Sequence, residues 1–506
     1  MPKFVITGHG WGHGIGMPQY GAYGYAQHGS SYSDILDHFY PGTAKGKAGL
    51  AKIRVLLDAG RSSVSIHSDS AWTVRDGQGR SWTLAPGTKS FPSSLRVGLN
   101  GKTRALTSPV TLTRKNGGAL DVGGRPYRGS IVLRNGAGLS IINSVGLEAY
   151  LKGVVPGEMP ASWHPEALKA QAVAARSYAL ASRHTGGTFD VYDDTRSQVY
   201  YGMSAELPTT NSAVNATAHE IRTFDGHVAT TFFYSSSGGR TASVHDVWGS
   251  APVPYLRSVV DQYDTISPYH NWGPYSYTRA KMDSLLGSQV SGLLLDLTTA
   301  SNPSRRIATV TMKGTRGSTS MSGESFRFAL GLRSSWFHIG VLNLTSVKGT
   351  VAYGKGTYLS GIARGLGKAW LESKHGSGSW TKVRDLEVTA SKTFKTLVKP
   401  TTKTSYRVRT AQAVGPTRTL KVATNVAFAK PTDRSGLSGV VLPRRNGVKV
   451  TIQKLTDAGT WKAVKSGTTT NGNFTIAFAV QNKTYRAVAT VPGYLAGVSP
   501  TLAITG

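Results

Sequence analysis

The sequence predicts an α+β protein, in which a mixed core and a β-rich subdomain precede two immunoglobulin-like β-sandwich modules. Three observations predict this class. An alanine-rich segment near residue 165 favours a helix, and residues 50–142 consist of short alternating runs between glycine turns. The last third of the chain contains an internal repeat. These patterns divide the chain into segments 1–45, 46–142, 143–340, 345–427 and 428–506.

The composition limits the class of protein. With 506 residues the chain is long enough for several hydrophobic cores, and without cysteine it has neither disulfides nor thiolate metal ligands. Its 58 Lys and Arg against 26 Asp and Glu give a net charge of +32, which attracts nucleic acid, anionic membranes or the acidic polymers of a bacterial wall. No window has the apolar length of a membrane helix. The first residues lack the apolar core of a secretory signal, so if the protein is exported its signal is absent from this sequence.

The first 45 residues begin with a glycine-rich segment. Residues 8–17 read GHGWGHGIGM, and glycine at every second position permits unusual dihedral angles and close approach of another backbone or a ligand. His9 and His13 are four residues apart, but such a loop does not favour a helix that would turn both toward one ion, so no metal site is expected. The pattern of residues 19–28 and 33–40 predicts two short helices.

Residues 46–142 predict a β-rich subdomain. Alternating apolar runs lie at 53–57, 63–66, 72–74 and 131–133, separated by Asp-Gly, Asn-Gly and Gly-Gly pairs that are typical of turns. We expect a strand at each run.

The mixed core, 143–340, contains a single acidic residue between two prolines. Residues 154–160 read VVPGEMP, and Glu158 is the acid. Because proline fixes its own φ and disfavours helical geometry in the residue before it, we expect a stiff, non-helical turn. A helix then begins at Pro165 and runs to about His184, before two glycines. A rigidly held acid beside a helix of small residues predicts the floor of an active site.

Other elements of the core follow from weaker patterns. We expect helices over 211–220 and 322–330 and a strand around 230–234. The loop after that strand, 235–240, reads SSSGGR and lacks the spacing of a nucleophile elbow, so a serine hydrolase is not expected.

The C-terminal third contains a repeat of about 80 residues, the size of a small β-sandwich module. Trp380, Phe394 and Tyr406 recur as Trp461, Phe474 and Tyr485, at offsets of 81, 80 and 79 residues. We expect two modules, divided near residue 428, whose lysine-rich surfaces suit attachment rather than chemistry.

Long runs of the core resemble the SpoIID/LytB family of bacterial cell-wall proteins. They are residues 147–160 and 166–178, with the shorter runs 192–193, 197–200, 234–241 and 255–259. The resemblance covers about residues 1–340 and identifies 143–340 as a SpoIID-like catalytic core. In the family, the segment GHGIGM, here Gly12–Met17, more commonly follows the helix matched by residues 323–336; in this chain it comes first, as in a circular permutation. Because domain termini often lie close together, it can still fold into the same place.

The resemblance implies lytic transglycosylase activity on peptide-free peptidoglycan strands, with Glu158 as the catalytic acid. Lytic cleavage needs one carboxylic acid, which protonates the glycosidic oxygen and then accepts the proton of the muramic acid C6 hydroxyl as a 1,6-anhydro ring closes. Some relatives instead enhance a wall amidase, and some carry a Cys/His zinc site that a chain without cysteine does not reproduce. No cofactor is expected.

Several further residues are candidates for substrate binding. Gln171, Arg176 and Tyr178 could hold the N-acetyl or lactyl groups, with Arg176 pairing to a carboxylate. The remaining candidates, on the walls around Glu158, are Gln198, Tyr200, Ser236, Ser237, Gly238 and His13.

Structural roles for the same residues remain open. Glu158 could cap the helix, Arg176 could form an ion pair with Asp193 or Asp194, and Gln171 and Tyr178 could pack the helix against a sheet.

Three functions remain open at this stage. The first is cleavage of the β-1,4 bond between N-acetylmuramic acid and N-acetylglucosamine by an extracytoplasmic, wall-associated enzyme. The second is a non-catalytic, wall-binding amidase enhancer, with a cell-wall amidase as partner. The third is nucleic-acid binding driven by charge, although the sequence contains no recognised nucleic-acid module. For the first two, the expected partners are peptidoglycan glycan strands and anionic wall polymers.

Overall fold

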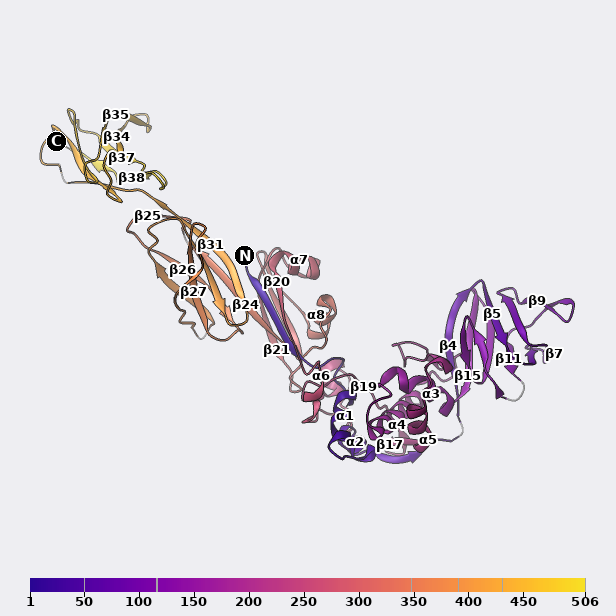
Figure 1. The fold of residues 1–506 in the computed structure, drawn as a ribbon. Helices are drawn as coiled ribbons and strands as arrows, with labels where there is room; N and C mark the ends of the chain where they lie inside the picture. Colours follow the sequence, from indigo (N-terminus) through magenta and orange to yellow (C-terminus); the bar gives the residue numbers. More distant parts are fainter. Residues whose placement is uncertain (50, 115–116, 347, 390, 430, 506) are drawn as a thin grey trace.

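The protein is an elongated α+β molecule. The computed structural model describes residues 1–49, 51–114, 117–346, 348–389, 391–429 and 431–505. Hydrophobic cores follow one another along its length, from a β-rich part at one end, through a helical part and a mixed part, to two β modules at the other end (Figure 1). None of the helices in these ranges is long and apolar enough to cross a membrane.

The β-rich part consists of two sheets, whose strands are antiparallel apart from the parallel pair β16 and β4, with a short hairpin. A seven-stranded sheet has the order β16-β4-β15-β14-β11-β6-β7, a four-stranded sheet has the order β13-β12-β5-β8, and β9 pairs with β10. The strands predicted at 53–57, 63–66, 72–74 and 131–133 are confirmed as β4, β5, β6 and β14. The bounds are β4 Lys52–Arg61, β5 Ser63–Ser68, β6 Trp72–Arg75, β7 Ser81–Leu84, β8 Gly87–Pro92, β9 Arg96–Leu99, β10 Lys102–Ala105, β11 Val110–Arg114, β12 Leu120–Val122, β13 Arg125–Tyr127, β14 Ser130–Asn135, β15 Leu139–Gly146 and β16 Val191–Tyr192.

The helical part is built around one central helix, α4. This helix contacts α1, α2, α3 and α5. Its buried residues lie all round the helix, and most are alanine, so the neighbouring helices can approach closely. The bounds are α1 Gln19–Gln27, α2 Tyr32–Phe39, α3 Leu147–Glu158, α4 Pro165–Ser182, α5 Pro208–Ala216 and α6 Val244–Trp248, with small sheets formed by β3 Ala44–Lys47, β17 Glu220–Phe224 and β18 His227–Val228, and by β2 Met17–Pro18 and β19 Phe233–Tyr234.

The structure corrects the prediction for residues 154–160. They were expected to form a non-helical turn, but Pro156 lies inside α3 and Glu158 is the last residue of that helix. Val154 and Val155 are fully buried in the core shared with the β-rich part, and this packing outweighs the local preference of a residue before proline.

Other helix predictions hold with shifted ends. The two short N-terminal helices and the helix at 322–330 are confirmed as α1, α2 and α8. The central helix begins at Pro165 as predicted but ends at Ser182, before the glycines. The helix expected over 211–220 is α5, which ends at Ala216 because the chain enters strand β17 at Glu220. The strand expected around 230–234 is reduced to Phe233 and Tyr234.

The mixed part holds the N-terminal strand as the second strand from one edge of a five-stranded sheet. β1 lies antiparallel between β20 and β24, so the glycine-rich segment that follows it emerges beside residues 333–336. The bounds are β1 Lys3–His9, β20 Asn271–Thr278, α7 Arg279–Leu286, β21 Leu294–Ser301, β22 Ile307–Gly314, β23 Gly317–Ser322, α8 Gly323–Leu330 and β24 Phe337–Ser346.

The predicted repeat reappears as the same side-chain contacts in two successive β modules. The guanidinium of Arg407 lies 4.0 Å from the ring centre of Trp380, and that of Arg486 lies 4.3 Å from the ring centre of Trp461. The immunoglobulin-like topology stays a prediction. The bounds are β25 Thr350–Ala352, β26 Thr357–Arg364, β27 Ala369–His375, β28 Thr381–Asp385, β29 Thr393–Val398, β30 Thr404–Thr410 and β31 Val414–Ala423, then β32 Asn425–Phe428, β33 Gly436–Leu442, β34 Lys449–Leu455, β35 Trp461–Thr468, β36 Asn473–Ala477, β37 Thr484–Ala489, β38 Gly497–Val498 and β39 Leu502–Ala503.

Candidate active site

Glu158 lies at the wall of a cavity of about 320 Å³ in the helical part. It is the only carboxylate among the lining residues, which come from the glycine-rich segment, α3, α4, the loop after β16, the segment leading into β19, and α6. They are His13, Glu158, Tyr178, Thr195, Ser197, Val199, Phe232, Phe233 and Trp248. The cavity falls in the size range of small-ligand sites and combines aromatic walls with few polar groups.

The environment of Glu158 favours its neutral form. Burial raises the pKa of its carboxyl above the ordinary value, and hydrogen bonds from the backbone of Val199 and the side chain of Gln19 oppose part of this shift. The Gln19 Nε2 atom lies 3.3 Å from Oε2 of Glu158. Within the described residues, no Lys or Arg forms an ion pair with it. A carboxyl with a raised pKa keeps its proton to higher pH than an ordinary carboxyl, so it can donate that proton and accept one afterwards.

His13 forms a neutral wall of the cavity. The backbone N–H of Ile15 donates to its Nδ1 atom at 3.1 Å, so this nitrogen carries no proton, and Nε2 therefore donates to the carbonyl oxygen of Phe233 at 3.1 Å. Burial lowers the pKa of His13 to about 4. With both ring nitrogens occupied, His13 shapes the cavity and holds no proton for exchange near neutral pH.

The glycine repeat explains how His13 reaches this place. Gly16 has a φ of +75°, and a Cβ atom there would lie 2.1 Å from the carbonyl oxygen of Phe232. At Gly10, with a φ of +71°, the same atom would lie 2.6 Å from the carbonyl oxygen of Ser236. The predicted close approach of the backbone is confirmed: the segment lies directly on residues 232–237, a contact that only glycine allows.

Tyr178 enters the cavity from α4. Its ring contacts Phe232 and Phe233 edge to face, and burial raises the pKa of its hydroxyl. The helix therefore presents one amphipathic side chain to the same space as Glu158 and His13.

Comparison with known proteins identifies this part of the chain. Residues 135–224 match the SpoIID family, described as stage II sporulation protein. They include Glu158, Tyr178 and the loop 193–199. Residues 135–224 belong to the SpoIID family.

Individual relatives extend the SpoIID match but cover only part of each protein. The chain is 46% identical over 122 residues to the amidase enhancer of Bacillus subtilis, which is 24% of this chain and 16% of that one. It is 32% identical over 214 residues to stage II sporulation protein D of Bacillus subtilis (39% and 61% of the two chains) and 33% identical over 216 residues to that of Bacillus amyloliquefaciens (39% and 60%). This chain thus spans less than two thirds of each relative.

Several solved structures are similar to part of the chain at low TM-scores. A segment of two fibronectin type III domains from chicken tenascin is 14% identical, with a TM-score of 0.20, over 32% of this chain and 98% of that one.

Two candidates on the SpoIID helix α4 lie outside the cavity. Arg176 is fully buried and forms a two-pronged ion pair with Glu148, with distances of 2.7 and 3.0 Å, so the alternative partners Asp193 and Asp194 were wrong. Gln171 is also fully buried, and neither of its side-chain polar atoms has a hydrogen-bond partner among the described residues. Arg176 and Gln171 are therefore buried inside the protein and do not line the cavity beside Glu158.

Gln198 and Tyr200 fasten the loop after β16 to the core instead of lining the cavity. Gln198 accepts a hydrogen bond from Tyr150 at 3.2 Å, and the Tyr200 hydroxyl donates to Asn143 at 2.8 Å. Both residues are buried, and they hold the adjacent Val199 next to Glu158.

The Ser236–Gly238 segment encloses a different carboxylate. The hydroxyl of Ser236 and the backbone N–H groups of Ser237 and Gly238 all donate to Asp264 at 2.8–3.0 Å. Ser236, Ser237 and Asp264 are buried, and none of the three serine and glycine residues lines the Glu158 cavity. Small polar residues of this kind would also suit a sugar. In this protein they donate the hydrogen bonds that the buried carboxylate of Asp264 needs.

As residues of this site, sequence reasoning missed Gln19, Trp248, Thr195, Ser197 and Val199. Trp248, at the end of α6, is exposed, and its ring centre lies 5.5 Å from that of His13. Residues 197–200 already stood among the runs that resemble the family, but nothing in the sequence placed Gln19 beside Glu158. In the described ranges no three His, Asp or Glu side chains gather closely enough to hold a metal ion.

Proposed function

We propose that this protein is a wall-associated lytic transglycosylase that cleaves the β-1,4 bond between N-acetylmuramic acid and N-acetylglucosamine in peptide-free peptidoglycan strands. One observation carries the proposal: a single carboxyl, with a pKa raised by burial and without a basic partner among the described residues, lines an aromatic-walled cavity. Hydrolysis with two acids would need a second carboxylate, and the lining residues provide only Glu158.

The proposed chemistry uses Glu158 first as an acid and then as a base. Protonated Glu158 donates to the glycosidic oxygen, and the bond from that oxygen to C1 of the muramic acid breaks. The resulting carboxylate then accepts the proton of the C6 hydroxyl, whose oxygen bonds to C1 and closes the 1,6-anhydro ring. Because the nucleophile belongs to the same sugar, its effective concentration is high and no bound water is required. The rings of Trp248 and Phe233 suit the faces of the sugars.

Digestion of peptide-free glycan strands, with products analysed by mass spectrometry, tests this proposal. We expect 1,6-anhydro ends from the wild type and a loss of at least about 100-fold in rate for Glu158→Gln. Glu166→Gln is a matched control, since Glu166 lies outside the cavity and pairs with Lys169. Reducing ends in place of anhydro ends would show hydrolysis and contradict the proposal.

The second candidate is a non-catalytic amidase enhancer, favoured by the 46% identity to a relative of that name. It predicts glycan binding that Glu158→Gln leaves unchanged, and cleavage only after a cell-wall amidase is added. The same digest separates the two functions because an enhancer alone gives no anhydro ends.

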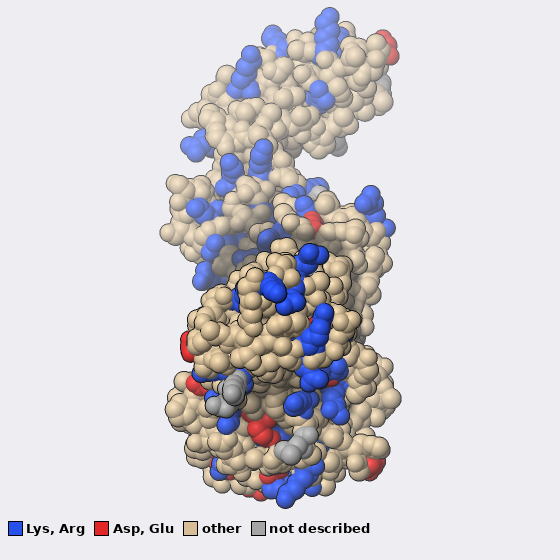
Figure 2. All heavy atoms as spheres, turned by 90° about the vertical axis from the view of Figure 1, so that its right-hand side faces the viewer, with Lys and Arg blue, Asp and Glu red and all other residues tan. Residues whose placement is uncertain are grey.

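The C-terminal modules support attachment to anionic wall polymers outside the cytoplasm. Residues 345–506 contain 25 Lys and Arg against 5 Asp and Glu. Lys and Arg also outnumber acidic side chains on the face of the molecule drawn in Figure 2. Such attraction is screened by salt, so retention on walls is expected to fall as ionic strength rises.

A further inference from the structure

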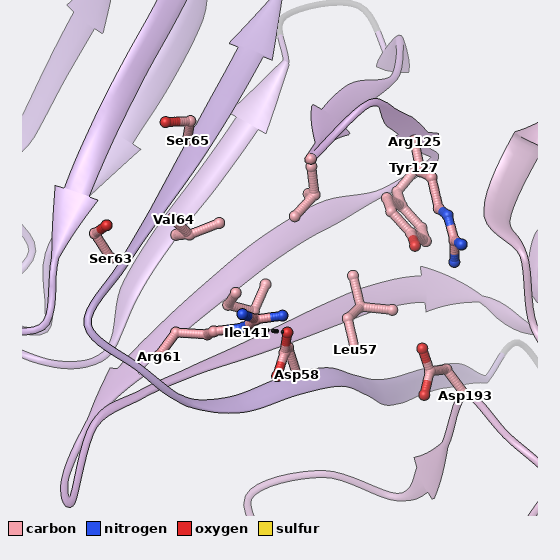
Figure 3. Close-up of a pocket in the computed structure, with 12 residues that line it drawn as sticks. Leu57, Asp58, Arg61, Ser63, Val64, Ser65, Arg125, Tyr127, Ile141 and Asp193 are labelled. Carbon is pink, nitrogen blue, oxygen red and sulfur yellow. Dashed lines mark hydrogen bonds and ion pairs between the residues drawn. The ribbon is translucent and has the colours of Figure 1, made fainter.

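A second cavity, of about 470 Å³, opens between the two sheets of the β-rich part (Figure 3). Its lining comes from β4, β5, β12, β13 and β15, from the β12–β13 turn, and from the start of the loop after β16. The residues are Leu57, Asp58, Arg61, Ser63, Val64, Ser65, Val122, Gly123, Arg125, Tyr127, Ile141 and Asp193. None of them lines the Glu158 cavity.

A β-bulge shapes this second cavity. The register between β4 and β15 shifts on both sides of Ile141, so that Leu57 is an extra residue between Leu56 and Asp58. In a regular strand consecutive side chains point to opposite faces, yet Leu57 and Asp58 both line the cavity. Bulges often re-aim side chains beside binding sites, and this one adds a carboxylate to an apolar floor.

The charges of the cavity are balanced. Asp58 forms an ion pair with Arg61 at 2.5 Å, and Figure 3 shows Arg125 and Asp193 apart from this pair, on the other side of the cavity. Arg125 is exposed, and no carboxylate in the described ranges lies within ion-pair distance of its guanidinium. An arginine in this state can bind a ligand carboxylate through two parallel hydrogen bonds, and Asp193 can accept from hydroxyl groups.

One loop joins the two cavities. The backbone N–H of Tyr200 donates to the carbonyl oxygen of Asp193 at 3.0 Å, which closes the loop between them. Asp193 faces the second cavity, while Thr195, Ser197 and Val199 face the first. The ring of Tyr127, in the second cavity, packs on Tyr200 at 5.9 Å. A single loop, closed by the hydrogen bond from Tyr200 to Asp193, therefore lines both cavities.

We propose that the second cavity is a distal subsite for the same glycan strand, in which Arg125 binds the lactyl carboxylate of a muramic acid residue. This inference rests on the proposed function, since it places a strand across Glu158. A saccharide that carries a carboxylate, hydroxyls and an amide matches a lining of arginine, aspartate, serine and tyrosine over an apolar floor. A phosphodiester polymer fits less well, because its dense negative charge would meet Asp58 and Asp193.

Binding of oligosaccharides of two lengths to the full chain tests the subsite without cleavage. The parent is Glu158→Gln, and the probes are peptide-free oligomers of one and of four disaccharide repeats, measured by calorimetry. We expect an added Arg125→Gln to weaken binding of the four-repeat oligomer about tenfold and to leave the one-repeat oligomer unchanged. An added Ser65→Trp, which fills the cavity from β5, should have the same effect.

Arg104→Gln is the matched control, because Arg104 is an exposed arginine on β10 outside the cavity. Equal weakening for both lengths, or none for either, would overturn the subsite, as would a larger effect of Arg125→Gln on binding of poly(glycerol phosphate). Length-dependent binding without anhydro products from the wild type would instead refute the proposed cleavage and leave the subsite standing. Anhydro products from the wild type, together with binding effects that do not depend on length, would refute the subsite and leave the proposed cleavage standing.

Discussion

Gln19, the first residue of α1, donates a hydrogen bond from Nε2 to Oε2 of Glu158, the last residue of α3, across 3.3 Å. The two residues are 139 positions apart in the chain. The N-terminal segment thus contributes directly to the environment of the proposed acid, through Gln19 on one side and His13 on another.

Removal of the Gln19 amide should move the pH profile of cleavage. This donor favours the charged carboxylate, so Gln19→Leu leaves the effect of burial unopposed on that side and raises the pKa of Glu158. Because the first step needs the protonated acid, we expect the alkaline limb of kcat/KM to shift to higher pH. Gln27→Leu, at an exposed position on the same helix, should leave the limb in place. An unmoved limb in Gln19→Leu would show that the hydrogen bond does not tune the acid.

Gly16→Ala should destabilise the helical part strongly. The new Cβ atom would lie 2.1 Å from the Phe232 carbonyl oxygen at a residue with a φ of +75°, so the backbone must shift as well as accept strain. We expect a loss of about 3 kcal/mol in the free energy of unfolding, measured by urea denaturation. Gly29→Ala is the control: its φ is +85°, but no atom lies within 4 Å of the added methyl, so the loss should be about 1 kcal/mol. Equal losses would mean that close packing at Gly16 adds nothing.

The sequence predicted elements best where local rules and burial agree. Helix α4 combines Pro165 at its start with alanine throughout, and both features survive in the structure. At α3 the two disagree: proline argues against a helix, while burial of Val154 and Val155 favours one and prevails. Those valines share their core with residues as distant in the sequence as Ile53 and Val55 of β4, which a local pattern does not reveal.

The candidate site shows the same limit. Glu158, Tyr178 and His13 were predicted and do line one cavity. Gln19 was not, because its contact with Glu158 depends on how α1 packs against the end of α3. The Ser236–Gly238 segment was interpreted from residue type alone, and serine and glycine donors serve a buried aspartate as well as a sugar.

Arg176→Met should distinguish a structural arginine from a substrate-binding one. The Arg176 side chain is fully buried and paired with Glu148, so its removal leaves a partly buried carboxylate without its partner. We expect a loss of about 3–5 kcal/mol in the free energy of unfolding. Arg196→Met, which breaks an exposed pair with Asp194, should cost less than about 1 kcal/mol. Unchanged stability together with a raised KM for glycan would instead support the substrate role predicted from the sequence.

Two enclosed groups should give the stability of the protein opposite pH dependences. His13 has a folded pKa of about 4 against 6.5 when unfolded, so the unfolded state binds more protons between these values and stability rises with pH from about 4 to 6.5. Burial, with the nearby Asp264 charge, raises the pKa of Asp261 from 3.8 to about 7, so the folded state binds more protons there and stability falls as pH rises through that window. Each effect is at most about 3–4 kcal/mol.

Single variants separate these two slopes in urea denaturation between pH 4 and 7. His13→Gln removes the rising contribution, so stability should fall with pH across the whole window. Asp261→Asn mimics the neutral acid and removes the falling contribution, so stability should rise up to about pH 6.5. The wild type, with both groups, should change less with pH than either variant. If both variants kept the wild-type profile, neither group would titrate as its burial requires, and a neutral His13 beside Glu158 would lose its support.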